Sequence, residues 1–252
     1  MQKKKLISRR KAIGAGLTAV GGLMLGGCYK KPLPPTYGNL LRMGDLLTYV
    51  SERTLLPGQK PVRQFSKTEI TSFPAVGCIN PADPAIRETY SKDYEALKNS
   101  NFNDWQLSVE GLVSRPAKYT MADLKKLGEQ TQITRHQCEE GWSAIAEWTG
   151  VTLSAILQHA GIMPNARFVS IYGYDNYAES IDMVDALHPQ TLLAYTMNGA
   201  DLPLQHGAPV RLRIETQIGY KSVKYVHTLK VTDTFIDPNH DQEAGWSWST
   251  GI

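Results

Sequence analysis

The sequence predicts an α+β fold in which short helices are combined with mixed and antiparallel sheets. Apolar and polar residues alternate in several segments, such as 104–113 and 210–215, and this alternation is typical of half-buried strands. Between these segments lie short stretches with helix start and stop signals. No repeat, low-complexity tract or clear linker follows residue 40, so we expect one α+β domain.

The helix signals are mainly capping residues. Thr120 and Asp123 have capping-box spacing, and Gly128 fits the C′ position that ends the same helix. Apolar spacing and caps together predict helices at residues 38–56, 85–99, 121–127 and 153–160, the last between Thr152 as N-cap and Gly161 as stop.

The strand signals are alternation and turn residues. Asn198-Gly199 is the strongest hairpin signal in the chain. In 210–215 we expect the apolar residues to face inward and Arg211, Arg213 and Glu215 to face outward. The predicted strands are residues 104–113, 130–137, 168–171, 180–183, 191–197, 210–215 and 221–232.

The N-terminus reads as an export signal. Residues 1–11 are basic, and residues 12–27 form an apolar run too short for a comfortable membrane span. Ser8-Arg9-Arg10-Lys11 resembles a twin-arginine (Tat) signal, and Leu25-Gly26-Gly27-Cys28 resembles a lipobox. We therefore expect a signal peptide at 1–27 and a periplasmic or cell-envelope protein, anchored to a membrane surface through lipidated Cys28. A plain signal peptide is the alternative.

Charge and cysteine content exclude two other classes. Part of the net charge of +3 lies in the first eleven residues, so the remainder is near neutral and does not suggest a nucleic-acid binder. Three cysteines do not form a disulfide framework. We expect 28–77 to be a tether and N-terminal arm, followed by the functional domain at 78–252.

Cys138 is the central candidate for a functional residue. It follows the predicted strand 130–137, and Arg135 and His136 precede it. Positive charge favours the thiolate, which is a nucleophile or a soft metal ligand. A buried inert cysteine is the alternative.

A second polar group follows in 206–224. His206 and Arg211 stand at the start of a predicted strand, and Lys221, Ser222 and Lys224 follow Gly219. In an extended segment Lys221 and Val223 face one side, and Ser222 and Lys224 the other. These residues suggest an anion cradle, although a solvated strand face would look the same.

Other chemistries fit less well. Walker A, GxGxxG, HExxH, GxSxG and CxxC patterns are missing from the sequence. A zinc site is weak because few His and Cys remain near Cys138. A Cys-dependent hydrolase with His136, His206 or His227 as base stays open, as does a non-catalytic exported binding module.

Several segments taken in order resemble the molybdopterin-binding domain of the sulfite oxidase family, in its exported bacterial branch. That branch includes the methionine sulfoxide reductase catalytic subunit. The resemblance covers about residues 78–252. The segments that carry it are 105–116, Thr134 to Ser143, Trp148 to Leu153, Leu193 to Gly199, His206 to Arg213 and Gly219 to Tyr225.

The resemblance implies a molybdenum–molybdopterin cofactor with Cys138 as the one protein thiolate on the metal. It places Arg135 and His136, with Trp142 and Tyr220, near the substrate. His206 stands where the sulfite-oxidising branch carries His and the sulfoxide-reducing branch Asn. The implied cofactor-binding residues are Asn80, Asp83, Pro84, Tyr172, Gly173, His206, Arg211, Lys221, Ser222, Val223 and Lys224.

The implied reaction is two-electron oxygen-atom transfer at molybdenum. The chain has no cytochrome b5-like domain and no room for the C-terminal dimerisation domain of sulfite oxidases. We therefore expect a separate electron-transfer partner, either a membrane haem protein or a cytochrome c. Reduction of a small sulfoxide-like substrate is the preferred reading, and sulfite-type oxidation is the alternative.

Overall fold

The computed structural model of the protein describes residues 40–55, 60–238 and 247–252. The predicted signal peptide 1–27 and Cys28 lie outside the described residues. Within the described part, no helix has the length and apolar character needed to cross a bilayer.

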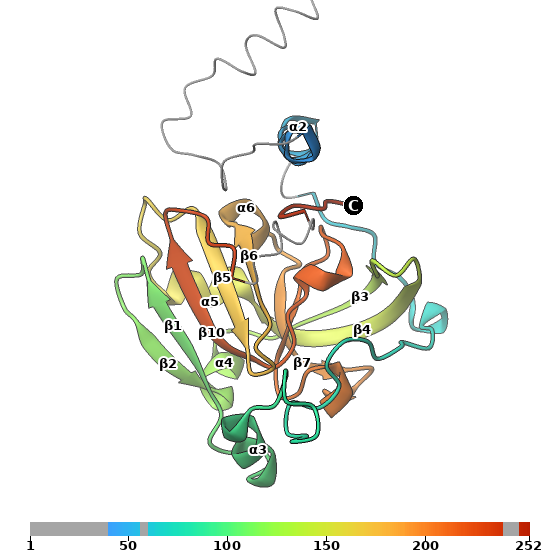
Figure 1. Ribbon diagram of the computed structural model, residues 1–252, viewed down its shortest axis with the longest axis vertical. Coiled ribbons are helices and arrows are strands. Elements are labelled where there is room, and N and C mark those ends of the chain that lie inside the picture. Colours follow the sequence, from blue (N-terminus) through green and yellow to red (C-terminus); the bar gives the residue numbers. More distant parts are fainter. Residues whose placement is uncertain (1–39, 56–59, 239–246) are drawn as a thin grey trace, which may run out of the picture. The chain divides into compact units, whose positions relative to one another are not determined.

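Within these residues the strands form two five-stranded sheets (Figure 1). The first sheet has the order β2-β1-β10-β5-β6, and only its β1–β10 pair is parallel. The second has the order β3-β4-β7-β8, with β9 also paired to β7, and is antiparallel throughout. The first comprises β1 Gln106–Gly111, β2 Ala117–Thr120, β5 Phe168–Gly173, β6 Ala178–Asp182 and β10 Val226–Thr232; the second comprises β3 Gln130–Gln137, β4 Ser143–Thr152, β7 Leu192–Met197, β8 Ala200–Asp201 and β9 Arg211–Arg213.

Two helices, α4 and α5, begin at the predicted caps. The hydroxyl of Thr120 accepts the N–H of Asp123, and that of Thr152 accepts the N–H of Ala155. Gly161 ends its helix with a φ of 74°, which favours glycine. The helices are α2 Leu40–Leu55, α3 Lys92–Asn99, α4 Met121–Lys126, α5 Leu153–Ala160 and α6 Met183–Ala186, with 3₁₀ turns at Lys67–Glu69, Leu204–His206 and Gly219–Lys221.

One large apolar core joins the two sheets to the helices α4 and α5. It includes Leu107 from β1, Leu124 from α4, Ile156 from α5 and Leu212 from β9, all fully buried. A smaller cluster around Trp148 packs against Phe73 from the arm. Because burial of apolar area is the main stabilising contribution to folding, this shared core holds β9 and β10 in fixed positions.

The α+β class with mixed and antiparallel sheets is confirmed, but some elements differ from expectation. The predicted helix 85–99 begins only at Lys92, because residues 83–90 form turns. Met183 starts α6 instead of ending a strand. The expectation that Arg211, Arg213 and Glu215 face outward was wrong: they are 4%, 1% and 3% exposed. Both faces of this segment are covered, one by the core and one by the site.

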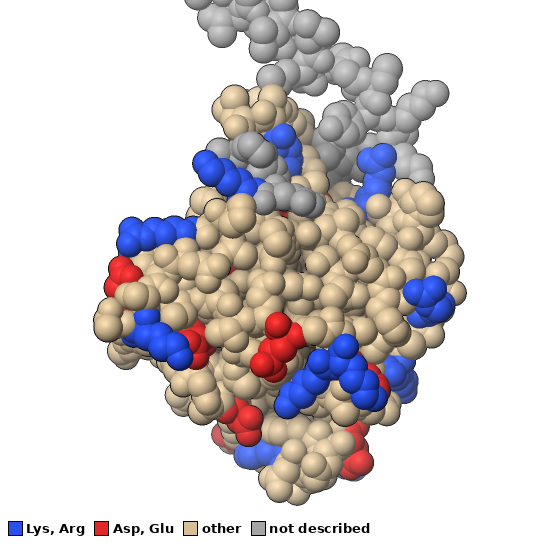
Figure 2. Space-filling view, turned by 180° about the vertical axis from the view of Figure 1, so that it is seen from behind, with Lys and Arg blue, Asp and Glu red and all other residues tan. Residues whose placement is uncertain are grey.

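The arm residues 60–77 pack on the second sheet. The N–H of Phe65 donates to the carbonyl of Ile133 at 2.9 Å, and the N–H of Thr71 donates to the carbonyl of Ile145 at 3.0 Å. These bonds carry the chain along β3 and β4 to the end of the sheet where Cys138 lies. Seen from behind the view of Figure 1, the molecule carries lysines and arginines scattered among uncharged and acidic residues (Figure 2).

Candidate functional site

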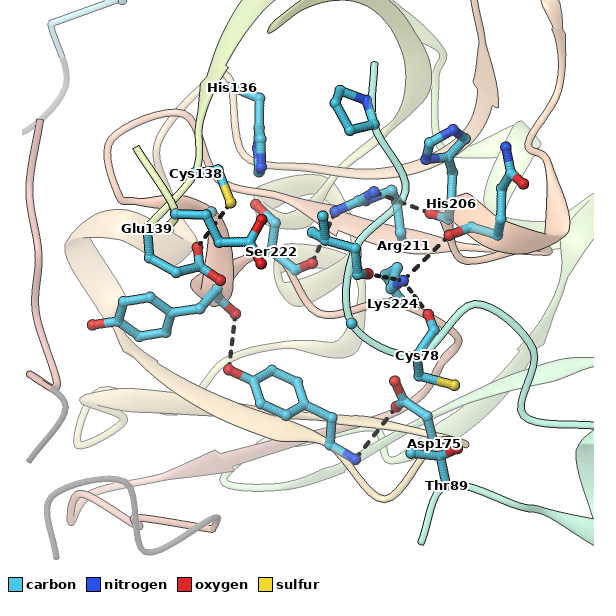
Figure 3. Close-up of a pocket in the computed structure, with 18 of the residues that line it drawn as sticks. Cys78, Thr89, His136, Cys138, Glu139, Asp175, His206, Arg211, Ser222 and Lys224 are labelled. Atoms are coloured by element: carbon cyan, nitrogen blue, oxygen red, sulfur yellow. Dashed lines mark hydrogen bonds between the residues drawn. The ribbon is translucent and has the colours of Figure 1, made fainter. Parts of the chain in front are cut away.

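A cavity of about 610 Å³ opens beside the end of β3. This volume is within the usual range for small-molecule and cofactor sites. Cys138 lines it, together with polar residues from β9, the segment before β10, the β5–β6 loop and the arm (Figure 3). Predicted site residues that line the cavity are His136, Cys138, His206, Arg211, Ser222 and Lys224.

A turn at the end of β3 presents Cys138 to the cavity. The backbone N–H of Cys138 donates to the carbonyl of Trp142 at 2.9 Å, and Gly141 N–H donates back to the carbonyl of Cys138 at 3.1 Å. Gly141 has a φ of 89°, a conformation that favours glycine. The turn therefore fixes the thiol, which is 7% exposed, at the cavity wall.

The expected positive surroundings of this thiol are not found. Burial raises the pKa of the Cys138 thiol, and the nearby Glu139 carboxylate raises it further. Arg135 is exposed and places its guanidinium over the ring of Phe65, because neighbouring strand residues face opposite sides. Burial, followed by the charges of Arg213 and Arg211, lowers the pKa of His136 to about 2, so this imidazole is neutral. A bound metal ion would supply the missing positive charge.

His136 is oriented by a buried ion pair. Nδ1 of His136 lies 2.7 Å from Nη1 of Arg213, and Arg213 pairs with Glu215 at 2.9 Å. A guanidinium nitrogen only donates, so Nδ1 is the acceptor and the ring proton resides on Nε2. Gln132 donates to the other carboxylate oxygen of Glu215 at 3.1 Å. The network thus presents a neutral N–H donor beside Cys138.

Arg211 is a buried cation without an acidic partner in the described residues. Its side chain donates to the carbonyl oxygens of His206, Ser222 and Leu212, at 3.0, 3.1 and 3.4 Å. Two of its five N–H groups are therefore left for a ligand. Burial and the neighbouring Arg213 lower its pKa to about 9, so it is charged at neutral pH. A desolvated cation of this kind is stabilised by an anion in the cavity.

Lys224 adds a second positive charge and holds three loops together. Its ammonium donates to the carbonyl oxygens of Val76 at 2.8 Å, Gln205 at 3.2 Å and Cys78. Burial, and then the charge of Arg211, lowers its pKa to about 8. Lys224 therefore raises the electrostatic potential of the cavity and fastens the arm to its wall.

The remaining predicted residues lie outside the cavity lining. Lys221 forms a buried ion pair with Glu179, and Val223 belongs to the apolar core. Asn80 and Asp83 accept N–H groups within their own turn, beside the exposed Pro84. Tyr172 and Gly173 lie in β5, and the cavity is lined by the loop that follows them. Their cofactor-binding roles stay predictions.

Several lining residues were not anticipated. The ring of Phe73 lies 5.1 Å from that of His136 and 5.5 Å from that of His206, so it packs between two predicted site residues. Phe73 lies in the predicted arm 28–77, whose sequence carries no local pattern of a site. Other unanticipated lining residues are Pro74, Val76, Gly77, Cys78, Glu88, Thr89, Glu139, Glu140, Asp175, Asn176, Tyr177 and Gln205.

The residues present fit a cofactor that brings most of its own metal ligands. In the described ranges, no group of three or more His, Cys, Asp and Glu side chains is placed to hold a metal ion. Cys138 would supply one thiolate, and Arg211 with Lys224 would hold an anionic group such as a phosphate. Thiol, cations and volume therefore suit a phosphate-bearing organic cofactor that carries a metal.

A comparison with protein-family models decides the assignment. Residues 94–239, more than half of the chain, match the oxidoreductase molybdopterin binding domain. The chain belongs to this family. Its identification as a molybdopterin-dependent oxidoreductase of the sulfite oxidase type, and the cofactor expected from the sequence, are thereby confirmed.

Curated relatives match part of the chain. A putative protein-methionine-sulfoxide reductase subunit YedZ1 from Azospira oryzae is 40% identical over 58% of this chain and 56% of its own length. A protein-methionine-sulfoxide reductase catalytic subunit MsrP from Ralstonia nicotianae is 32% identical over 51% of this chain and 44% of its own. The chain thus spans about half the length of these relatives.

Among solved structures, the sulfane dehydrogenase SoxCD from Paracoccus pantotrophus matches with 27% identity and a TM-score of 0.49, over 52% of this chain and 39% of that chain.

The buried His206 makes the cofactor-free protein sensitive to acid. Burial, followed by Arg211 and Lys224, lowers the pKa of His206 to about 4, below its unfolded value of about 6.5. The folded protein thus binds fewer protons, and stability is lost as pH falls from about 6.5 to about 4. Between about pH 6.5 and about pH 4, we expect the free energy of unfolding to fall by about 1–3 kcal/mol less in His206→Gln than in wild type. Urea unfolding at a series of pH values measures this difference. If the free energy of unfolding fell equally in both proteins, His206 would not be the buried group whose protonation destabilises the fold.

Proposed function

We propose that this chain catalyses two-electron reduction of a small, uncharged, sulfoxide-like substrate at the Cys138 end of the cavity. The bound cofactor supplies oxygen-atom transfer and accepts or releases electrons. The observation that carries the proposal is the charge distribution: Glu139 and Glu140 line the cavity beside Cys138, whereas His136 is neutral and Arg135 faces away. This end repels an anion such as sulfite and accepts a neutral S–O group.

The chain's own residues have separate tasks in this reaction. Nε2–H of His136 is a fixed, neutral donor for a substrate oxygen, because Arg213 occupies Nδ1. Tyr220 and Gly219 form the adjoining wall, and a Cβ at Gly219 would lie 2.6 Å from the imidazole. Gly219 therefore allows the wall to approach the donor closely. The names of the relatives, which refer to methionine sulfoxide, support the same substrate class.

We further propose that the protein is exported by the Tat route, anchored by lipidated Cys28, and receives electrons from a separate membrane haem protein. The basic and apolar residues before Cys28 support this part of the proposal. The relatives' description as reductase subunits supports a separate electron donor.

The reaction direction is tested by assaying cofactor-loaded protein both ways. One assay couples a reduced viologen dye to methyl sulfoxides and methionine sulfoxide, and the other couples sulfite to cytochrome c or ferricyanide. We expect kcat/KM for the preferred sulfoxide to exceed that for sulfite by at least about tenfold, a difference of about 1.4 kcal/mol. A protein that oxidises sulfite faster would contradict the proposed direction, and His206 in the cavity would then favour the sulfite-type reaction.

Neutralising the two carboxylates tests whether their charge is the cause of the discrimination against sulfite. In the double variant Glu139→Gln/Glu140→Gln, kcat/KM for sulfite should rise relative to kcat/KM for the sulfoxide, because the repulsion of the anion is removed. Turnover of the uncharged sulfoxide should change less. The exposed Glu110 on β1 provides the control, as Glu110→Gln.

A further inference from the structure

The wall that faces the His136 donor is a single 3₁₀ turn, Gly219–Lys221. Gly219 and Tyr220 both line the cavity, and a Cβ at Gly219 would lie 2.6 Å from Nε2 of His136. Among the described residues, the turn pairs with no strand of either sheet. Its distance from the donor therefore depends on the contacts made by its side chains and by the residues next to it.

The segment 247–252 holds the phenol oxygen of Tyr220 with two hydrogen bonds. The Tyr220 hydroxyl donates to the carbonyl oxygen of Ser247, and the hydroxyl of Thr250 donates to the Tyr220 oxygen at 3.1 Å. These bonds use the phenol both as a donor and as an acceptor. The ring is thus fixed at the end that is far from the backbone of the turn.

The same segment pairs with the chain just before the turn. The N–H of Ile218 donates to the carbonyl of Thr250 at 3.0 Å, and the N–H of Thr250 donates to Oε1 of Gln217 at 2.6 Å. A bridge between Gln217 and Gly251 continues this pairing. Thr250 therefore contacts both the backbone that leads into the turn and the side chain of Tyr220 within it.

The segment lies beside α2 (Figure 1) and is itself anchored in the fold. Trp248 is buried, and its ring lies 4.6 Å from that of Tyr49 on α2 and 5.5 Å from that of Phe235. Nε2 of Gln217 donates to the buried Asp185 at 2.9 Å. Because burial of an aromatic ring contributes more than one hydrogen bond does, loss of the Thr250 hydroxyl should not detach the segment.

We propose that Thr250 is a positioning residue that holds Tyr220, and with it the turn 219–221, close to His136, and that this closeness selects small sulfoxides. The inference rests on the proposed function and deepens it, because it names the feature that limits substrate size. A wall held close to the donor contacts a small substrate and excludes a bulky one. When the wall relaxes, a small substrate loses contacts and a bulky one gains room.

The test is a double-mutant cycle of Thr250→Val and Tyr220→Phe in the cofactor-loaded protein. Thr250→Val keeps the branched side chain without its hydroxyl, and Tyr220→Phe keeps the ring. The measured quantity is kcat/KM for methyl phenyl sulfoxide divided by kcat/KM for dimethyl sulfoxide. Because both values come from the same sample, a partly unfolded or partly loaded protein leaves this ratio unchanged.

We expect the ratio to rise about two- to tenfold in Thr250→Val, which is the scale of one lost hydrogen bond. In the Tyr220→Phe background the same substitution should change the ratio by less than about twofold, because the hydroxyl through which Thr250 acts is already gone. The control is Thr131→Val, which removes a comparable bond between the exposed hydroxyls of Thr131 and Thr149 on the second sheet. The control should keep the wild-type ratio.

Hydrogen exchange in the cofactor-free proteins measures how firmly the turn is held, independently of activity. We expect the amides of residues 218–222 to exchange about two- to tenfold faster in Thr250→Val than in wild type or the control, because local opening becomes easier. Unchanged exchange, an unchanged ratio, or an equal change of the ratio with and without the Tyr220 hydroxyl would overturn the inference while leaving the proposed function intact. A wild-type protein that reduces neither sulfoxide would instead overturn the proposed function, and the size selection with it.

Discussion

Replacing Cys138 by serine is expected to lower turnover by at least about a hundredfold, because a hydroxyl is a poor substitute for a thiolate on a soft, redox-active metal. The backbone turn at 138–142 does not depend on the sulfur, since Cys138 is held there by its own N–H and carbonyl. The variant should therefore fold normally. Turnover with a viologen dye and the thiolate-to-metal absorption band would both be measured.

Cys78→Ser provides the matched comparison for that absorption band. Cys78 is the other free thiol in the described part of the chain and lines the same cavity. If Cys138 is the metal ligand, the band is lost in Cys138→Ser and kept in Cys78→Ser. If the band were lost in Cys78→Ser and kept in Cys138→Ser, Cys78 would be the metal ligand, and our interpretation of the site would be refuted.

Replacing Arg211 by methionine is expected to reduce the cofactor content of purified protein by about tenfold or more, because the anionic group loses its charge-assisted hydrogen bonds. Without cofactor, the loss of three bonds to backbone carbonyls opposes the gain from removing a desolvated cation. The stability of the cofactor-free variant should therefore change little. Pterin and metal per chain, and urea unfolding with and without cofactor, measure the two effects.

Arg213 on the same short strand is the contrasting case. It is equally buried, but Glu215 pairs with it at 2.9 Å. Arg213→Met leaves that carboxylate buried without a counter-charge, so we expect the cofactor-free protein to lose about 3–5 kcal/mol of stability. If Arg211→Met destabilised the cofactor-free protein as strongly as Arg213→Met, Arg211 would be a structural residue and not an anion-binding one.

The sequence predicts helix and hairpin ends correctly where the residues that form each end are close together in the chain. Thr120, Thr152 and Gly161 mark helix ends because their caps involve residues three or four positions away. The prediction that Asn198-Gly199 forms a hairpin is confirmed by the β7–β8 pair, in which both residues have positive φ. The end of β3 before Cys138 was also predicted, and with it the position of the thiol.

Features that depend on long-range packing were missed. β4 was not anticipated because residues 144–148 are buried in succession, so that alternation is absent. Arg213 was expected to face outward, but its guanidinium finds its partners inside the protein. His136, which is distant in sequence, accepts a hydrogen bond from it, and the nearby Glu215 pairs with its charge. Phe73 and Asp175 reach the cavity through loops, whose course depends on contacts between segments far apart in sequence.

The measurement that tests the central claim most directly is the molybdenum and pterin content of wild-type protein purified from a host that makes the molybdopterin cofactor. Elemental mass spectrometry and pterin fluorescence on the same sample give both quantities. The site described here, with one thiolate at Cys138 and unpaired cations at Arg211 and Lys224, predicts about one molybdenum and about one pterin per folded chain. A correctly folded protein that contains neither would contradict it.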